Sequence, residues 1–175
     1  MSAPKQPAVS FKGPTGSFLV ELLTYNGAPF HDHWALWVSL HDDPNFGVYI
    51  HATGDVRNGF TFELKRSYHL DEASDSIPTT RIPLQWVDAE HFDEKAMFND
   101  GKETFDHVPV CEFETSVHKV EAPKKSLNSV GDQGTPGKKI VQRDCQTWIV
   151  EAADQLVQDG IFNKDVAAFL HSIQQ

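Results

Sequence analysis

Two hydrophobic periodicities divide this chain, and together they limit the folds that it can adopt. In the first half, apolar and polar residues alternate along short stretches, which is typical of antiparallel strands. These stretches are residues 16–25, 33–40, 46–52 and 60–65, with a further strand expected around 83–87. Asn58-Gly59, directly before the fourth stretch, is a strong hairpin signal. We therefore expect an antiparallel sheet built largely from consecutive hairpins.

The C-terminal part of the chain has the helical period instead. Apolar residues recur three and four positions apart in two stripes, over residues 141–157 and 166–173. Gly160 suits the end of the first helix, and Asn163 suits the N-cap of the second. Because strands come first and helices last, without alternation, the expected fold class is α+β. A doubly wound α/β fold is disfavoured for the same reason.

Length and composition indicate one domain. With 175 residues and 39% hydrophobic content, the chain can fill a single core. We expect residues 1–14 to be a flexible tail. Residues 119–139 combine glycine, proline and lysine, so they are expected to form a mobile loop that leads towards the last helices.

Charge and cysteine content exclude several classes of partner. A net charge of −10 argues against nucleic-acid binding and against adsorption to anionic membranes. No apolar run has the length of a membrane span, and the N-terminus does not resemble a signal peptide. The two cysteines, Cys111 and Cys145, show no disulfide framework. We therefore expect a cytoplasmic protein with free thiols.

Two histidines are expected on one face of the first hairpin. His33 begins the motif His-Trp-Ala-Leu-Trp-Val, and His51 ends the motif Val-Tyr-Ile-His on the next strand. With the turn centred near Asp42 or Asp43, the two side chains lie opposite or nearly opposite each other. Such a pair can form a relay in which one imidazole is the base and the other orients it. Two half-buried histidines at a sheet edge are the alternative interpretation.

Cys145 is the candidate nucleophile. Asp144 is a favourable N-cap residue, which would place Cys145 in the first turn of a helix. There the unpaired N–H groups and the helix dipole favour the thiolate, and they can also stabilise an oxyanion. If the helix began near Lys139 instead, Cys145 would be a buried core residue; Thr135 followed by Pro136 leaves that start open.

These motifs resemble a known superfamily. His-Trp-Ala-Leu-Trp-Val is similar to the His-Trp-Ala-hydrophobic-Tyr-Val strand of the lecithin:retinol acyltransferase-like proteins and their NlpC/P60 relatives. A second histidine follows on the next strand, and the nucleophile appears late, in Asn-Cys-Glu-His-Phe-Val, where this chain has Asp-Cys-Gln-Thr-Trp-Ile. The resemblance implies a circularly permuted papain-like fold. It also implies that Cys145 is the nucleophile, His33 the general base and His51 the third, orienting residue.

The activity that this resemblance implies is that of a cysteine-dependent hydrolase or acyltransferase. An amide, ester or thioester of a small acyl or peptide-like substrate would react through an acyl-enzyme on Cys145. The catalytic groups need no cofactor. The histidines at 31 and 33 could chelate a metal only with a third ligand, for which Asp55 or His51 is the candidate, so a metal site is disfavoured. Two alternatives stay open: a non-catalytic binding or accessory protein on the same fold, and a deconjugating cysteine peptidase.

Large aromatic residues flank the candidate catalytic groups. Most of them are expected in the core, but those beside the histidines could line an acyl or peptide pocket. The candidate substrate-binding residues are Trp34, Trp37, Tyr49 and Trp148.

Overall fold

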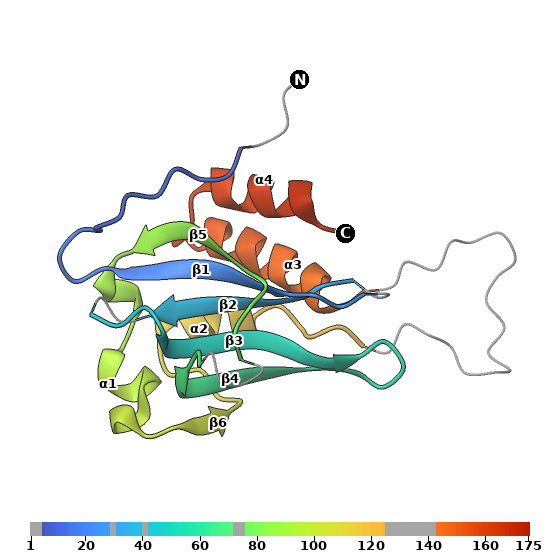
Figure 1. Cartoon of the computed structure of the whole chain (residues 1–175), viewed down its shortest axis with the longest axis horizontal. Coiled ribbons are helices and arrows are strands. Elements are labelled where there is room, and N and C mark those ends of the chain that lie inside the picture. The colour runs from blue at the N-terminus through green and yellow to red at the C-terminus, as the bar shows by residue number, and fades with distance from the viewer. Residues whose placement is uncertain (1–4, 29–30, 40–41, 72–75, 125–142) are drawn as a thin grey trace, which may run out of the picture.

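The computed structural model describes residues 5–28, 31–39, 42–71, 76–124 and 143–175. Its largest element is a six-stranded sheet with the strand order β5-β1-β2-β3-β4-β6, in which every pairing is antiparallel (Figure 1). The strands are β1 (Phe18–Tyr25), β2 (His33–Ser39), β3 (Phe46–Asp55), β4 (Gly59–His69), β5 (Thr80–Val87) and β6 (Thr104–Asp106).

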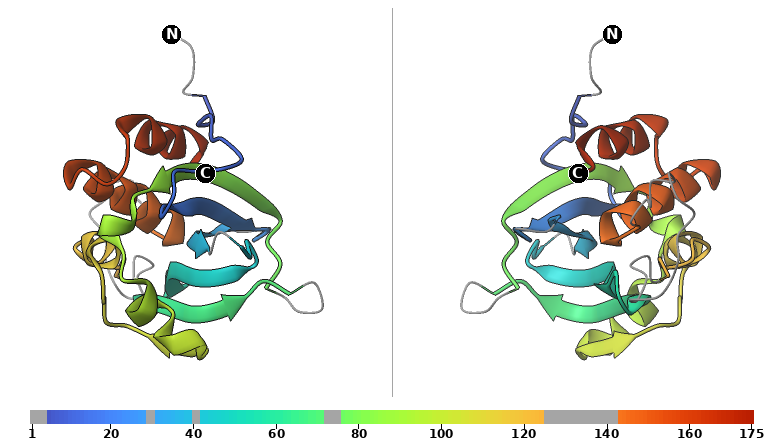
Figure 2. Two further views of the ribbon diagram at one scale, coloured as in Figure 1. Left: turned by 90° about the vertical axis from the view of Figure 1, so that its left-hand side faces the viewer. Right: turned by 90° about the vertical axis from the view of Figure 1, so that its right-hand side faces the viewer.

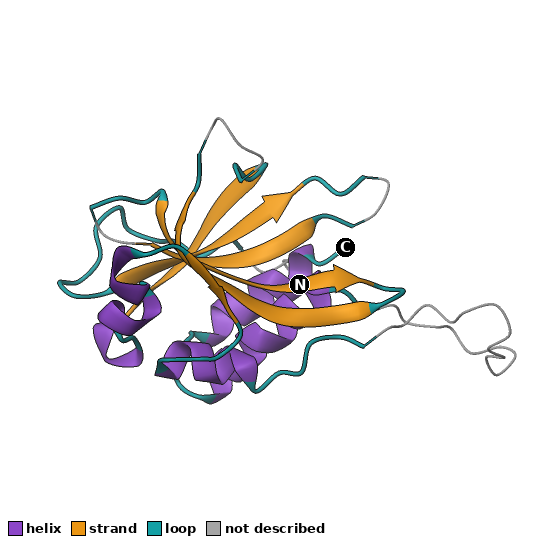
Figure 3. Ribbon diagram, turned by 90° about the horizontal axis from the view of Figure 1, so that it is seen from below, coloured by secondary structure: helices purple, strands orange, loops and turns teal. Residues whose placement is uncertain are grey.

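Helices cover one face of this sheet, so the molecule has two layers (Figure 3). The central helix α3 (Cys145–Gln158) packs on β2 and β3, while α2 (Glu112–His118) and α4 (Lys164–Ile173) pack against α3. Short turns of helix follow β5: η1 (Ala89–His91), α1 (Glu94–Met97) and η2 (Asn99–Gly101). The structure is therefore α+β, with the sheet first in the chain and the long helices last.

The helix side of the sheet holds the main core. Alternate residues of the central strands, such as Leu36 and Ile50, point towards α3, where they meet Trp148 and Leu156. All four of these side chains are at most 1% exposed. The apolar residues whose spacing predicted the strands and helices are thus the residues that the sheet and the helices bury against each other.

The opposite face of the sheet buries a second, smaller cluster. Its buried members are Leu23, Ala35, Trp37, Tyr49 and Leu70. The described ends of the connection from β4 to β5, residues 70–71 and 76–79, lie on this side, away from the helices (Figure 2). There the Tyr25 hydroxyl donates a hydrogen bond of 2.8 Å to the carbonyl oxygen of Ser76. Residues on this face are therefore partly shielded without a helix above them.

The first hairpin confirms that His33 and His51 share a face. Leu36 pairs with Ile50 and Trp37 with Tyr49, so the hairpin is centred on Asp43. Side chains alternate with a period of two, and a shift of the register by two residues keeps the same faces together. His33 is therefore a diagonal neighbour of His51 on the side away from the helices.

The second hairpin also follows its sequence signal. Asp55 pairs with Gly59, and the carboxylate of Asp55 accepts hydrogen bonds from the backbone N–H groups of Arg57 and Asn58. Gly59 has a φ of +87°, a conformation that glycine adopts without strain. The expected mobile loop over 119–139 lies mostly outside the described residues, as does the start of the expected tail.

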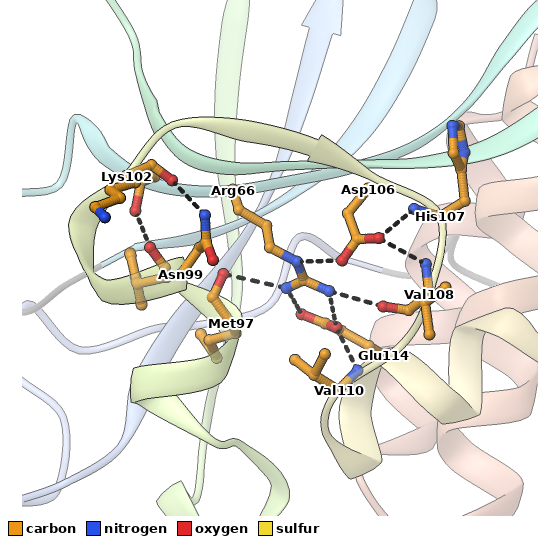
Figure 4. Close-up of polar contacts among 11 residues, drawn as sticks. Arg66, Met97, Asn99, Lys102, Asp106, His107, Val108, Val110 and Glu114 are labelled. Carbon is orange, nitrogen blue, oxygen red and sulfur yellow. Dashed lines mark hydrogen bonds and ion pairs between the residues drawn. The ribbon is translucent and has the colours of Figure 1, made fainter.

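A buried arginine joins elements that the periodicity did not predict, β6 and α2 (Figure 4). The Arg66 side chain is 2% exposed, yet all five of its N–H groups have acceptors. Two bonds of 2.8 Å go to the Glu114 carboxylate and one of 2.9 Å goes to Asp106. The backbone carbonyls of Met97 and Val108 accept the other two. Arg66 thus ties β4 to β6, α1 and α2.

Candidate active site

A chain of hydrogen bonds joins two imidazoles and a carboxylate across β2, β3 and β4. Nε2 of His33 lies 2.9 Å from Nδ1 of His51, and Nε2 of His51 lies 2.9 Å from Oε1 of Glu63. The register explains the second contact, since His51 and Glu63 are cross-strand partners. The side chains of His51 and Glu63 are 6% and 18% exposed. These three side chains form what we call the relay.

The direction of these bonds follows from what each group can donate. A carboxylate only accepts, so Nε2 of His51 carries the proton that is shared with Glu63. In a neutral imidazole the other nitrogen is then an acceptor, and Nε2 of His33 must donate to it. Nδ1 of His33 is consequently left with its lone pair. The relay therefore prepares His33 as a base at one defined nitrogen.

Electrostatics keep the two imidazoles of this relay neutral. Burial, with positive charge at His51 and Lys65, lowers the pKa of His33 to about 4. Burial also lowers the pKa of His51, although its bond to Glu63 opposes the effect. At neutral pH both rings are thus uncharged, and His33 is available to accept a proton.

Cys145 is the first residue of α3, as the capping pattern predicts. The Asp144 carboxylate accepts from the backbone N–H groups of Gln146 and Thr147, and the Thr147 hydroxyl accepts from the Asp144 N–H. This is a complete capping box. Asp144 has extended backbone, so α3 begins at Cys145; the alternative start near Lys139 lies outside the described residues. Cys145 therefore lies where helix N–H groups face the side chain.

The thiol lies against the backbone that flanks His33. Sγ of Cys145 is 3.9 Å from the carbonyl oxygen of Asp32, and the backbone N–H of Trp34 also interacts with the sulfur. Burial raises the pKa of Cys145 to about 11 and outweighs these N–H groups, so the resting group is a thiol. Within the described residues, no hydrogen bond joins Cys145 directly to His33. The N–H groups at the helix start do lower the pKa of Cys145, as expected, but burial raises that pKa by more.

Gln146 fixes the start of α3 against the start of β2. Its side chain is fully buried, and Nε2 donates to the carbonyl of Asp32 at 2.9 Å and to Oε1 of Gln175 at 2.8 Å. Gln175 accepts in turn from the backbone N–H of Asp32, at 2.6 Å. Residues from three distant parts of the chain thereby hold the backbone next to both Cys145 and His33.

The predicted substrate-binding aromatics lie in two places. Trp34 and Trp148 belong to the core beneath the helices, with exposed fractions of 3% and 0%. Trp37 is fully buried on the other face, and its indole N–H donates to the carbonyl of Pro44. Tyr49 lies on that same face, with its ring centroid 4.7 Å from that of His51. Only Tyr49 is thus in contact with the relay, and a role in substrate binding stays a prediction for all four.

Glu63 is the member of the relay that sequence reasoning did not identify. The signal was present, because a turn at residues 56–58 pairs His51 with Glu63 across the second hairpin. In contrast, neither Cys111 nor the remaining histidines take part in the relay. Cys111 is the N-cap of α2, and burial raises its pKa to about 11 as well.

The capping box gives a direct test of how α3 is started. Asp144→Ala should lower the free energy of unfolding by about 1–2 kcal/mol, because the first N–H groups of α3 lose their acceptor. Asp144→Asn should be close to wild type, since asparagine caps equally well. Urea denaturation of the three proteins measures both effects. If both variants lost the same amount of stability, the effect would come from the charge of Asp144 and its contact with His31 and not from the cap.

No group of three or more histidine, cysteine, aspartate or glutamate side chains among the described residues has an arrangement that could hold a metal ion. Within the same part of the chain, no helix combines the length and the hydropathy needed to cross a bilayer.

Fold and site together define a class: an α+β protein with an imidazole relay on its sheet and a helix-borne thiol against the neighbouring backbone. The chain belongs to DUF6540, a family of unknown function, whose profile matches residues 20–163. That range contains the relay and Cys145. No curated protein and no solved structure matches the chain significantly.

Proposed function

We propose that this protein is a cysteine-dependent hydrolase or acyltransferase with a circularly permuted papain-like arrangement. The observation that carries the proposal is the hydrogen-bond chain from Glu63 through His51 to His33. This chain leaves Nδ1 of His33 unprotonated, and Sγ of Cys145 packs on the carbonyl of Asp32, the residue directly before His33. A buried, oriented and neutral imidazole close to a thiol is the arrangement that general-base activation of a nucleophile requires.

In the proposed reaction, His33 acts when the substrate is bound. Rotation of the Cys145 side chain away from the Asp32 carbonyl brings S–H to Nδ1 of His33. The sulfur attacks the carbonyl carbon of an amide, ester or thioester as the proton passes to Nδ1, and the carbonyl oxygen becomes an oxyanion. The backbone N–H of Cys145 is an available donor for this oxyanion, because the cap uses the N–H groups of Gln146 and Thr147.

The tetrahedral intermediate then collapses. The bond to the leaving amine, alcohol or thiol breaks as His33 returns its proton to that group, and Cys145 is left as a thioester. Water, or an acceptor amine or hydroxyl, gives up a proton to His33 and attacks the thioester. Release of the acid or of the new ester or amide restores the thiol. His51 and Glu63 stabilise the imidazolium that forms transiently at His33.

A specific observation favours a second candidate, a non-catalytic binding protein on the same fold. Cys145 is 7% exposed, and burial raises its pKa to about 11. A thiol in that state is a good core residue and a poor free nucleophile. Under this alternative the relay would be a set of polar groups that recognise a ligand.

Acylation by a simple activated ester separates the two candidates. After incubation with 4-nitrophenyl acetate, intact and peptide mass spectrometry should find one acetyl group on Cys145. The rate should fall as the pH drops through about 4, the pKa of His33, because only the neutral ring can accept the proton. It should show no step near the ordinary histidine pKa of about 6.5.

Cys111 is the internal control, since its thiol has the same raised pKa but no imidazole relay. It should not be acetylated over the neutral range. Equal and slow modification of both thiols, increasing only at alkaline pH, would contradict the catalytic proposal and favour the binding protein.

A further inference from the structure

Lys65 lies on the relay face of the sheet, inside a cage of aromatic rings. Its Nζ is 5.1 Å from the ring centroid of Tyr49, 5.1 Å from that of Tyr68 and 5.4 Å from that of Phe105. Tyr49 and Phe105 are its cross-strand partners on β3 and β6. Electron-rich ring faces hold a cation in a defined position with little solvent around it.

A β-bulge in β4 completes this cage. Tyr49 pairs with Lys65 and Gly47 with Tyr68, so Arg66 and Ser67 together oppose the single residue between Gly47 and Tyr49. Without the extra residue, Lys65 and Tyr68 would point to opposite faces of the sheet. Ser67 holds a φ of +50°, which is costly for a residue other than glycine. The strand thus carries local strain where it turns Tyr68 towards the ammonium group.

Within the part of the chain that the structure describes, the positive charge of Lys65 has no anionic partner. Among the described residues, no carboxylate lies within ion-pair distance of Nζ, and no hydrogen-bond acceptor is in reach of it. Glu63, two positions earlier on the same face, is bonded to His51 instead. Phe105 is 59% exposed, so the cage is open to solvent on that side. The ammonium is therefore oriented and accessible from one side, and no carboxylate of the described residues neutralises it.

This charge is close to the proposed catalytic base. The ring of Tyr49 contacts both regions: its centroid is 4.7 Å from that of His51, the hydrogen-bond partner of His33, and 5.1 Å from Nζ of Lys65. Lys65 also contributes to the lowered pKa values of both His33 and His51. A substrate whose carbonyl carbon reaches Cys145 could therefore extend a short chain towards Nζ.

We propose that Lys65 and its aromatic cage form a subsite for a carboxylate at the far end of the acyl group. The preferred donors are then half-esters, half-amides or half-thioesters of small dicarboxylic acids. The acyl part of this inference rests on the proposed function. The rings would contact the methylene chain, and the ammonium would bind the terminal carboxylate.

Two measurements test the subsite separately from catalysis. The first is calorimetric titration of Cys145→Ala with glutarate, in which no chemistry can occur. The second compares kcat/KM for the 4-nitrophenyl half-ester of glutaric acid with that for the neutral butyric ester. We expect glutarate binding and a preference of about ten- to a hundredfold for the anionic ester. Lys65→Met should abolish the binding and remove the preference, whereas Lys65→Arg should retain part of both.

Lys102, an exposed lysine near β6, supplies the matched control. Lys102→Met should leave both measurements unchanged. Should Lys65→Met fail to fold, Tyr68→Leu tests the same cage and should weaken glutarate binding. Hydrolysis of both esters at similar rates, without glutarate binding, would overturn the subsite and leave the proposed function standing. Lys65-dependent glutarate binding without hydrolysis of either ester would support the subsite and contradict the proposed enzymatic function.

Discussion

Glu114→Ala should lower the free energy of unfolding by about 3–5 kcal/mol, enough to unfold a marginally stable domain. The substitution leaves Arg66 buried, with its charge intact and two of its five hydrogen bonds lost. The remaining ionic partner of Arg66 is Asp106, which is partly exposed. The guanidinium cannot escape this cost by losing its proton, because its pKa is too high. Thermal and urea denaturation, followed by circular dichroism, measure the loss.

The same substitution in an exposed ion pair provides the control. Glu151 on α3 is bonded to Arg143, and the two side chains are 37% and 46% exposed. Glu151→Ala should change stability by less than about 1 kcal/mol, because water replaces the lost partner. The double variant Arg66→Met/Glu114→Leu should be more stable than Glu114→Ala alone, since it removes the buried charge together with its partner. A small effect of Glu114→Ala would show that the arginine reaches water or another acceptor.

His33→Gln should slow acylation of Cys145 by about 10²–10⁴-fold, the usual contribution of a positioned general base. Glutamine can still donate a hydrogen bond to Nδ1 of His51, so the sheet should remain intact. Cys145→Ala should abolish the acetyl label altogether. Glu63→Gln should give an intermediate loss, because the relay keeps its shape but no longer stabilises a positive charge at His33.

His171→Gln is the control for these variants. His171 lies on α4, is 52% exposed and is bonded to Asp154, far in sequence from the relay. Its substitution should leave the acylation rate at the wild-type value. Rates measured by quenched-flow mass spectrometry would contradict the relay if His33→Gln and His171→Gln behaved alike.

Local patterns predicted the parts of the site that depend on local rules. The shared face of His33 and His51 follows from the period of two, which survives an error of two residues in the hairpin register. The start of α3 at Cys145 follows from the capping chemistry of Asp144. Predicting that Glu63 joins the site requires one more step, which is to extend the register of the second hairpin from its turn to His51.

Other features depend on contacts between distant residues, which periodicity does not encode. Arg66 and Glu114 are 48 positions apart, and nothing in either neighbourhood indicates the pairing. The bulge at Ser67 reverses which residues share a face, so simple alternation assigns Tyr68 to the wrong side. The helix start alone predicts a lowered pKa for Cys145, but the amount of burial is decided by the whole fold and reverses the sign.

Under the proposed function, the protonated state of Cys145 also has a chemical consequence for the protein between reactions. Peroxides and other oxidants attack the thiolate form of cysteine, and their rates depend on how much of it is exposed. A thiol with a pKa of about 11 and an exposed fraction of 7% presents very little thiolate to these oxidants. Such a nucleophile would resist oxidative inactivation while at rest, and it would become reactive only when a bound acyl donor brings sulfur and imidazole together.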